Sequence, residues 1–92
     1  MTNQLCRHAI ISGHVQGVFY RSNSEQKAQE LSLTGWVRNI SGSQVEILMC
    51  GSEENLSKME KWLWEGPAAC TVSNVEIKDH AFESHSDFMI KH

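Results

Sequence analysis

Residues 36–49, WVRNISGSQVEILM, contain two short runs with apolar residues, separated by the small polar residues of 41–43. In the second run, 45–49, Val, Ile and Met occupy alternate positions, which is the pattern of a strand with one buried face. The first run, 36–40, has the length of a short strand, and the Ser-Gly-Ser between the runs is typical of a tight turn. The stretch therefore predicts a β-hairpin near the centre of the chain.

A strand and a helix are predicted before this hairpin. Residues 5–12, LCRHAIIS, have apolar residues on alternating faces and predict a strand. Beyond a loop with two glycines, Ser22 and Glu25 have the spacing of a capping box, so we expect a helix to begin at Ser22. The helix is predicted to run to about Leu33, with Gly35 as its stop.

A second helix and two more strands are predicted after the hairpin. Ser52 has the properties of a helix cap, and apolar residues recur behind it at helical spacing until Gly-Pro at 66–67 ends the pattern. Residues 72–80 predict a strand, and 88–90 predict a last short one. The buried face of this helix is expected to hold Leu56, Met59 and Leu63.

The element order β-α-β-β-α-β predicts an α+β fold of the ferredoxin-like, split βαβ type. We expect one domain over residues 1–92, with an antiparallel sheet of strand order 4-1-3-2 and two helices on one face. In this topology the first and second strands are parallel and lie two spacings apart, on the order of 10 Å. The loop 13–21 and Asn39 are then expected at the same end of the sheet.

Composition narrows the class of protein. The chain has 92 residues, 40% hydrophobic and 21% charged, with a formal net charge of -3, as expected for a soluble globular domain. No apolar stretch is long enough to span a membrane, and the first residues lack the pattern of a secretory signal, so we expect a cytoplasmic protein. A pI near 5.9 argues against a dedicated nucleic-acid binder.

The loop 13–21, GHVQGVFYR, has the parts of an anion site. Its glycines allow backbone N–H groups to converge, and it leads directly into a helix N-terminus with its positive dipole end. Arg21 adds a guanidinium fork suited to phosphate or carboxylate. Glycine spacing alone is weak evidence, because the loop is neither a P-loop nor a GxGxxG motif.

The same loop resembles the signature of the acylphosphatase family, GxVQGVxFR, and GWVRN at 35–39 resembles the family's second motif. The Val-Glu pair at 45–46 and the segment 62–67 also fit, so the resemblance covers essentially the whole chain. Two departures stand out: Tyr20 replaces the usual phenylalanine, and Ser43 replaces a glycine of the hairpin.

The resemblance implies an enzyme that hydrolyses acyl phosphates without cofactor or metal. Arg21 would bind the phosphate, Asn39 would orient the attacking water, and inorganic phosphate would be both product and competitive inhibitor. We expect a monomer. The backbone amides implied to cradle the phosphoryl oxygens are those of Val15, Gln16, Gly17, Val18, Phe19 and Tyr20.

Other interpretations of these residues remain open. Taken alone, an arginine at a helix start is usually a solvated charge, and an asparagine at a strand end is usually a turn residue. The alternative function is a non-catalytic ferredoxin-like module that binds an anion or a protein; a nucleic-acid-binding domain of this fold is disfavoured by the acidic balance. Of the remaining residues, His14 is expected to be exposed and non-essential. Glu46 is expected to be solvated or to brace the turn, and not to act as a base. The spacing of His80, His85 and His92 is too loose for a metal site.

Two of the three cysteines are predicted to face each other. In an antiparallel pair, opposed residues have a constant sum of their numbers, so pairing Ser12 with Gln44 also pairs Cys6 with Cys50. Directly opposed residues lie about 4.5–5.5 Å apart, within the range of a disulfide. We expect the bond under oxidising conditions, whereas a reducing cytosol favours two free thiols.

Overall fold

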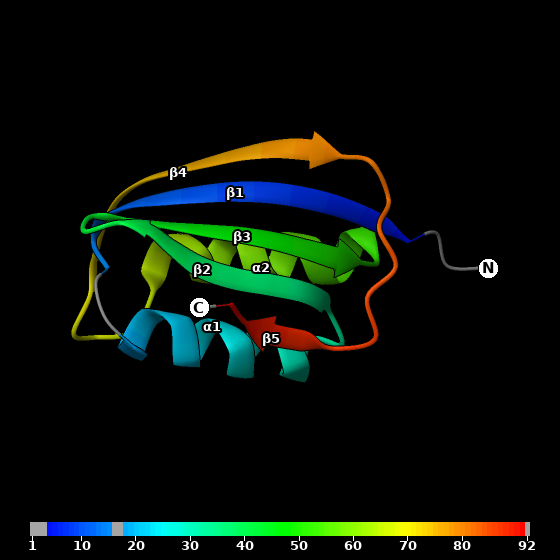
Figure 1. Cartoon of the computed structure of the whole chain (residues 1–92), viewed down its shortest axis with the longest axis horizontal. Coiled ribbons are helices and arrows are strands. Elements are labelled where there is room, and N and C mark those ends of the chain that lie inside the picture. Colours follow the sequence, from blue (N-terminus) through cyan, green and yellow to red (C-terminus); the bar gives the residue numbers. More distant parts are fainter. Residues whose placement is uncertain (1–3, 16–17, 92) are drawn as a thin grey trace.

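The computed structural model describes residues 4–15 and 18–91 of the chain (Figure 1). Its elements follow the predicted order, with strands at or beyond the predicted lengths. In chain order they are β1 (Leu5–His14), α1 (Val18–Glu30), β2 (Thr34–Ser41), β3 (Gln44–Gly51), α2 (Glu53–Glu65), β4 (Thr71–His80) and β5 (Phe88–Ile90).

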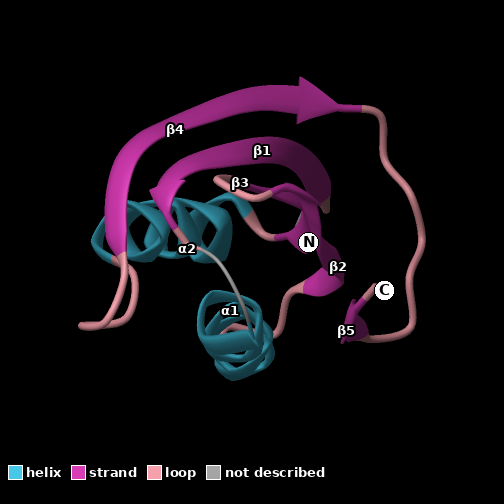
Figure 2. Cartoon of the chain, turned by 60° about the vertical axis from the view of Figure 1, so that its left-hand side comes forward, coloured by secondary structure: helices cyan, strands magenta, loops and turns pink. Residues whose placement is uncertain are grey.

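The strands form one sheet of order β4-β1-β3-β2-β5. Since β3 is antiparallel to both β1 and β2, these two strands are parallel, as the ferredoxin-like prediction requires. The predicted order 4-1-3-2 is therefore confirmed, but the sheet is one strand wider, because β5 pairs in parallel with β2. Both helices cover the same face (Figure 2), and the opposite face is called here the open face.

The main core lies between the sheet and the helices. The predicted face of α2 is buried, and its caps are confirmed: the Ser52 side chain accepts from the Asn55 amide, and the Gly66 amide donates to the Trp62 carbonyl. From α1, positions four residues apart face the sheet, including Ser24, whose hydroxyl donates to the Tyr20 carbonyl. The buried residues of the helices are Tyr20, Ser24, Ala28, Leu56, Met59 and Leu63.

The predicted start of α1 at Ser22 is wrong, because the helix already begins at Val18. Tyr20 and Ser24 can share one buried helical face only if residue 20 is itself helical, so burial overrides the local capping pattern. The helix ends at Glu30, and Ser32 adopts the left-handed conformation with φ 56°. Its amide donates to Gln29 and that of Leu33 to Ala28, which is a Schellman motif.

Gly35 is not the helix stop that was predicted; it lies inside β2. Its φ is +131°, and a Cβ at this position would run into the main-chain oxygen of Leu48 on the neighbouring strand. The Gly35 amide donates to the Asp87 carbonyl at 3.0 Å, next to β5. Close packing of β2 against β3 therefore requires a glycine at position 35. This requirement comes from the neighbouring strand and cannot be read from the local sequence.

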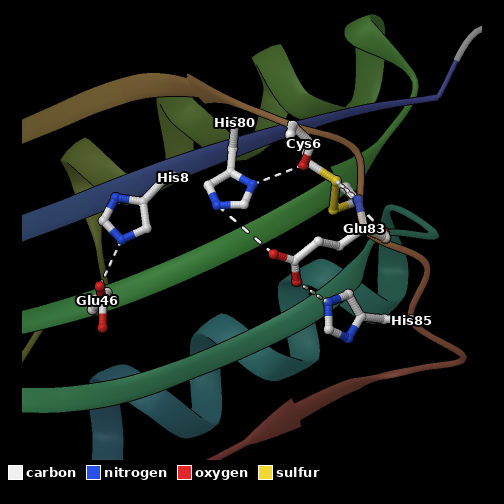
Figure 3. A network of polar contacts seen from close by, with 8 residues as sticks. Cys6, His8, Glu46, His80, Glu83 and His85 are labelled. Atoms are coloured by element: carbon white, nitrogen blue, oxygen red, sulfur yellow. Dashed lines mark hydrogen bonds and ion pairs between the residues drawn. A yellow bond between two sulfur atoms is a disulfide. The ribbon is translucent and has the colours of Figure 1, made fainter.

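The open face carries a small cluster around the predicted disulfide. Cys6 and Cys50 are opposed in the β1–β3 register and form a disulfide, which packs with Leu48 and Trp36. The segment 81–87 connects β4 to β5 past this end of the sheet, and the Glu83 amide donates to Cys6 Sγ at 3.3 Å (Figure 3). Neither helix in the described part of the chain is long and apolar enough to cross a membrane.

Candidate active site

The sheet register places Asn39 at the same end as the loop that follows β1. Val45 on β3 is paired with Ile11 of β1 on one side and with Asn39 of β2 on the other. Ile11 and Asn39 are therefore level with each other and two strand spacings apart, about 10 Å. The start of α1 and the β2–β3 turn also lie at one end of the molecule in Figure 1.

Asn39 belongs to the helix-covered side of the sheet. Residues opposed in an antiparallel pair project to the same face, and both Ile11 and Val45 are buried beneath the helices. Unlike them, Asn39 is exposed, because it stands at the end of β2 beyond the last buried residue, Val37. The pairing shifts register directly after it, between Asn39 and Ser41.

The end of β1 is tied to the hairpin that carries Asn39. The Gly13 amide donates to the Ser43 carbonyl at 3.0 Å, and the side chain of Gln44 donates to the Ser12 hydroxyl at 3.2 Å. Gly13 has φ +135°, and a Cβ there would collide with the backbone of β4. The first glycine of the loop is therefore required for close packing, and Val15 anchors the loop by a fully buried side chain.

The loop leads into the first turn of α1, which consists of residues 18–21. The first amides of a helix have no acceptor within the helix, and together they form its positive end. None of residues 18–21 is acidic, so no carboxylate in this turn offsets that charge. Arg21 lies in this turn and is half-buried, whereas the side chain of Phe19 is 65% exposed.

Tyr20 is the residue of the loop that departs from the family motif. Its hydroxyl points into the core and away from the solvent-exposed groups at this end of the sheet. It donates a hydrogen bond of 2.9 Å to the Leu63 carbonyl of α2, and its ring lies 5.7 Å from that of Trp62. Burial, with a smaller contribution from Cys70, raises the pKa of Tyr20 well above its usual value. The hydroxyl of Tyr20 is therefore engaged in the core and is not available to a ligand at the loop.

The structure brings most of the predicted site residues to this end of the sheet. Gln16 and Gly17 lie outside the described residues, and only the backbone of Val18 is described. His14 is exposed, as expected. His80 and His85 lie near Glu83 at the opposite end, and His92 lies outside the described residues. Within residues 4–15 and 18–91 no group of three or more His, Cys, Asp or Glu side chains could hold a metal ion.

Two contacts near the site were not foreseen from the sequence. One is the backbone hydrogen bond between Gly13 and Ser43, and the other is the pairing of the Glu46 carboxylate with both His8 and Arg38. The register that pairs Cys6 with Cys50 also pairs Ser12 with Gln44 and Ile10 with Glu46. The backbone neighbours of these residues on β1 and β3 were therefore predictable.

Comparison with known proteins gives a consistent picture. The profile of the family described as acylphosphatase matches residues 7–90. An acylphosphatase of Coxiella burnetii is 46% identical over 89 residues, which cover 97% of this chain and 94% of that protein. A solved acylphosphatase structure from Coxiella burnetii has a TM-score of 0.93 at 45% identity, covering 97% of this chain and 94% of that chain. The acylphosphatase structure from Bacillus subtilis has a TM-score of 0.91 at 30% identity, covering 96% and 99%.

Proposed function

This chain belongs to the acylphosphatase family and hydrolyses acyl phosphates, and we propose that it does so by direct attack of water on phosphorus. In this proposal Arg21 and the backbone amides of 15–20 hold the phosphoryl group, and Asn39 orients the water. The observation that carries it is the shared pairing of Val45, which aligns Asn39 with Ile11, close to the end of β1, on the helix side of the sheet.

The chemistry of the substrate explains why so few groups suffice. A carboxyl phosphate is a mixed anhydride, and its carboxylate is a good leaving group. Water attacks the phosphorus, the bond from phosphorus to the bridging oxygen breaks, and the carboxylate departs with the electron pair. Catalysis of phosphoryl transfer is then mainly positioning and stabilisation of charge, without a covalent nucleophile, a cofactor or a metal.

Arg21 suits the phosphoryl group by charge and geometry. Its guanidinium can donate two parallel hydrogen bonds to phosphoryl oxygens. The neighbouring amides at the start of α1 provide further donors, and the dipole of the helix favours a negative charge there. Inorganic phosphate carries the same oxygens, so we expect it to compete with the substrate.

Asn39 suits the water because a carboxamide both donates and accepts. Its carbonyl oxygen can accept a hydrogen bond from the water while its NH₂ group donates one to the water oxygen, and together they fix the direction of a lone pair on that oxygen. The amide does not ionise, so this orienting role does not depend on pH. We further propose a monomer that acts in the cytoplasm on small acyl phosphates, of the acetyl or carbamoyl type.

Hydrolysis of an aromatic acyl phosphate in excess EDTA tests this mechanism. We expect fast turnover by the wild-type chain, and a loss of very roughly 10³–10⁵ in rate for Arg21→Ala, by analogy with arginine fingers. Asn39→Ala should lower kcat but leave the inhibition constant of phosphate near its wild-type value.

Lys27→Ala is the matched control, because it removes one positive charge from the same helix, where Lys27 lies near Glu30. Its turnover should equal that of the wild type. Turnover that EDTA abolishes would overturn the metal-free mechanism. A folded wild-type chain without turnover would favour the binding module instead.

A further inference from the structure

Glu46 has both of its carboxylate oxygens occupied by side chains of the two neighbouring strands. One oxygen lies 2.6 Å from Nε2 of His8 on β1 (Figure 3), and the other accepts a hydrogen bond of 2.5 Å from Nε of Arg38 on β2. The Glu46 side chain is only 15% exposed. These three residues, called here the Glu46 clamp, join β1, β3 and β2 on the open face.

The clamp is built around a charged carboxylate. Burial alone would raise the pKa of Glu46, but the hydrogen bonds from His8 and Arg38 hold it below its usual value. At neutral pH Glu46 is therefore an ionised acceptor. The Glu46 side chain lies on the open face, whereas Asn39 projects from the helix side of the sheet. Glu46 therefore cannot serve the reaction as a base.

The clamp acts on the stretch of backbone that presents Asn39. Arg38 directly precedes Asn39, and Glu46 directly follows Val45, the residue paired with Asn39. Successive side chains in a strand point to opposite faces, so a contact on the open face fixes the strand segment that directs Asn39 to the other face. Directly beyond Asn39 the pairing of β2 with β3 shifts register. The backbone hydrogen bonds between the two strands therefore restrain β2 less at Asn39 than in the regular part of the sheet.

We propose that Glu46 is a positioning residue for the hydrolysis, which acts through Arg38 on the placement of Asn39. This inference rests on the proposed role of Asn39. It assigns to the open face of the sheet a part in a reaction that takes place on the helix side.

The first test compares Glu46→Gln with a matched variant, Glu83→Gln. Glu83 is also a carboxylate on the open face with histidine partners, His80 and His85, but it lies against Cys6 at the opposite end of the sheet (Figure 3). We expect Glu46→Gln to lower kcat about 10-fold, since small displacements of a positioned group have large effects on rate. Inhibition by phosphate should be unchanged, and Glu83→Gln should leave kcat at the wild-type value.

A double-mutant cycle then separates positioning from a general loss of stability. If Glu46 acts through Asn39, the effect of Glu46→Gln on kcat disappears in the Asn39→Ala background, while its effect on the urea midpoint persists. Where Asn39→Ala turns over too slowly to measure, the side-chain amide resonances of Asn39 decide, and they should shift in Glu46→Gln but not in Glu83→Gln. Glu46→Asp, which keeps the charge, should recover part of kcat.

The possible failures are distinguishable. If Asn39→Ala keeps the wild-type kcat, the role proposed for Asn39 is wrong. A second outcome is that Asn39→Ala lowers kcat, and that Glu46→Gln lowers kcat by the same factor in the wild-type chain and in Asn39→Ala. The role of Asn39 then stands, and the positioning role of Glu46 is overturned. An unchanged kcat in Glu46→Gln, or a weakening of phosphate inhibition equal to the loss of kcat, overturns it as well.

Discussion

The hydroxyl of Tyr20 donates a hydrogen bond to the main-chain oxygen of Leu63, 2.9 Å away in the buried core. Tyr20 lies in the first turn of α1, directly before Arg21, and Leu63 lies in the last turn of α2. The bond satisfies one of the carbonyl groups that a helix leaves unpaired at its C-terminus. The helix that carries Arg21 is thereby fastened to its neighbour.

Tyr20→Phe removes this bond and leaves the Leu63 carbonyl without its buried partner. We expect the free energy of unfolding to fall by about 1–2 kcal/mol in urea titrations. Turnover should stay at the wild-type value, because the hydroxyl points into the core. Trp64→Phe changes an exposed aromatic residue of α2 and should shift stability by less than about 0.5 kcal/mol. A loss of turnover in Tyr20→Phe at unchanged stability would instead place the hydroxyl in the site.

Tyr20 is also the only tyrosine of the chain, so tyrosinate absorbance at high pH reports this residue alone. Burial, and to a smaller extent the nearby Cys70, holds the pKa of Tyr20 well above its usual value of 10.0. The native state therefore keeps the proton to a higher pH than the unfolded chain does. The resulting contribution to stability is complete below about pH 10 and is lost as the pH rises further.

The absorbance change should consequently coincide with unfolding in the native protein and should occur near pH 10 in denaturant. Circular dichroism recorded on the same samples provides the comparison. Tyrosinate formation near pH 10 with intact secondary structure would contradict the buried position of the ring.

Ser32 is a non-glycine residue in the left-handed conformation, at the position after α1 where glycine is favoured. Ser32→Gly removes the strain of the Cβ but gives the unfolded chain more freedom, so we expect a net gain of about 0.5–1 kcal/mol in the free energy of unfolding. Ser57→Gly, at an exposed interior position of α2, should have the opposite sign, with a loss of about 0.5 kcal/mol. Equal losses in both variants would show that Ser32 is not strained.

Features that depend on local chemistry or on strand pairing were predictable from the sequence. Ser52 and Gly66 bound α2 as expected, since their capping roles involve only adjacent residues. The pairing of Cys6 with Cys50 followed from the topology once Ser12 was paired with Gln44, because one opposed pair determines every other pair in a regular antiparallel ladder.

Features that depend on distant packing were not predictable. The start of α1 is decided by the burial of Tyr20 against α2, and Gly35 is required by the approach of β3. The parallel pairing of β5 with β2 joins segments far apart in the chain. For the proposed site, the predicted topology was sufficient to place Arg21 and Asn39 at one end of the sheet. The contacts of Glu46 were not predictable, because they depend on side-chain directions across three strands.

The Cys6–Cys50 disulfide closes a loop with a sequence separation of 44 at the end of β1 away from the proposed site. Reduction should lower the free energy of unfolding by about 4 kcal/mol through loop entropy, without changing kcat under conditions where the chain stays folded. Thiol titration in denaturant checks the bond directly. The untreated wild-type chain should show one thiol, that of the free Cys70, and Cys70→Ser should show none. All three cysteines reacting in a chain purified without reductant would contradict the disulfide.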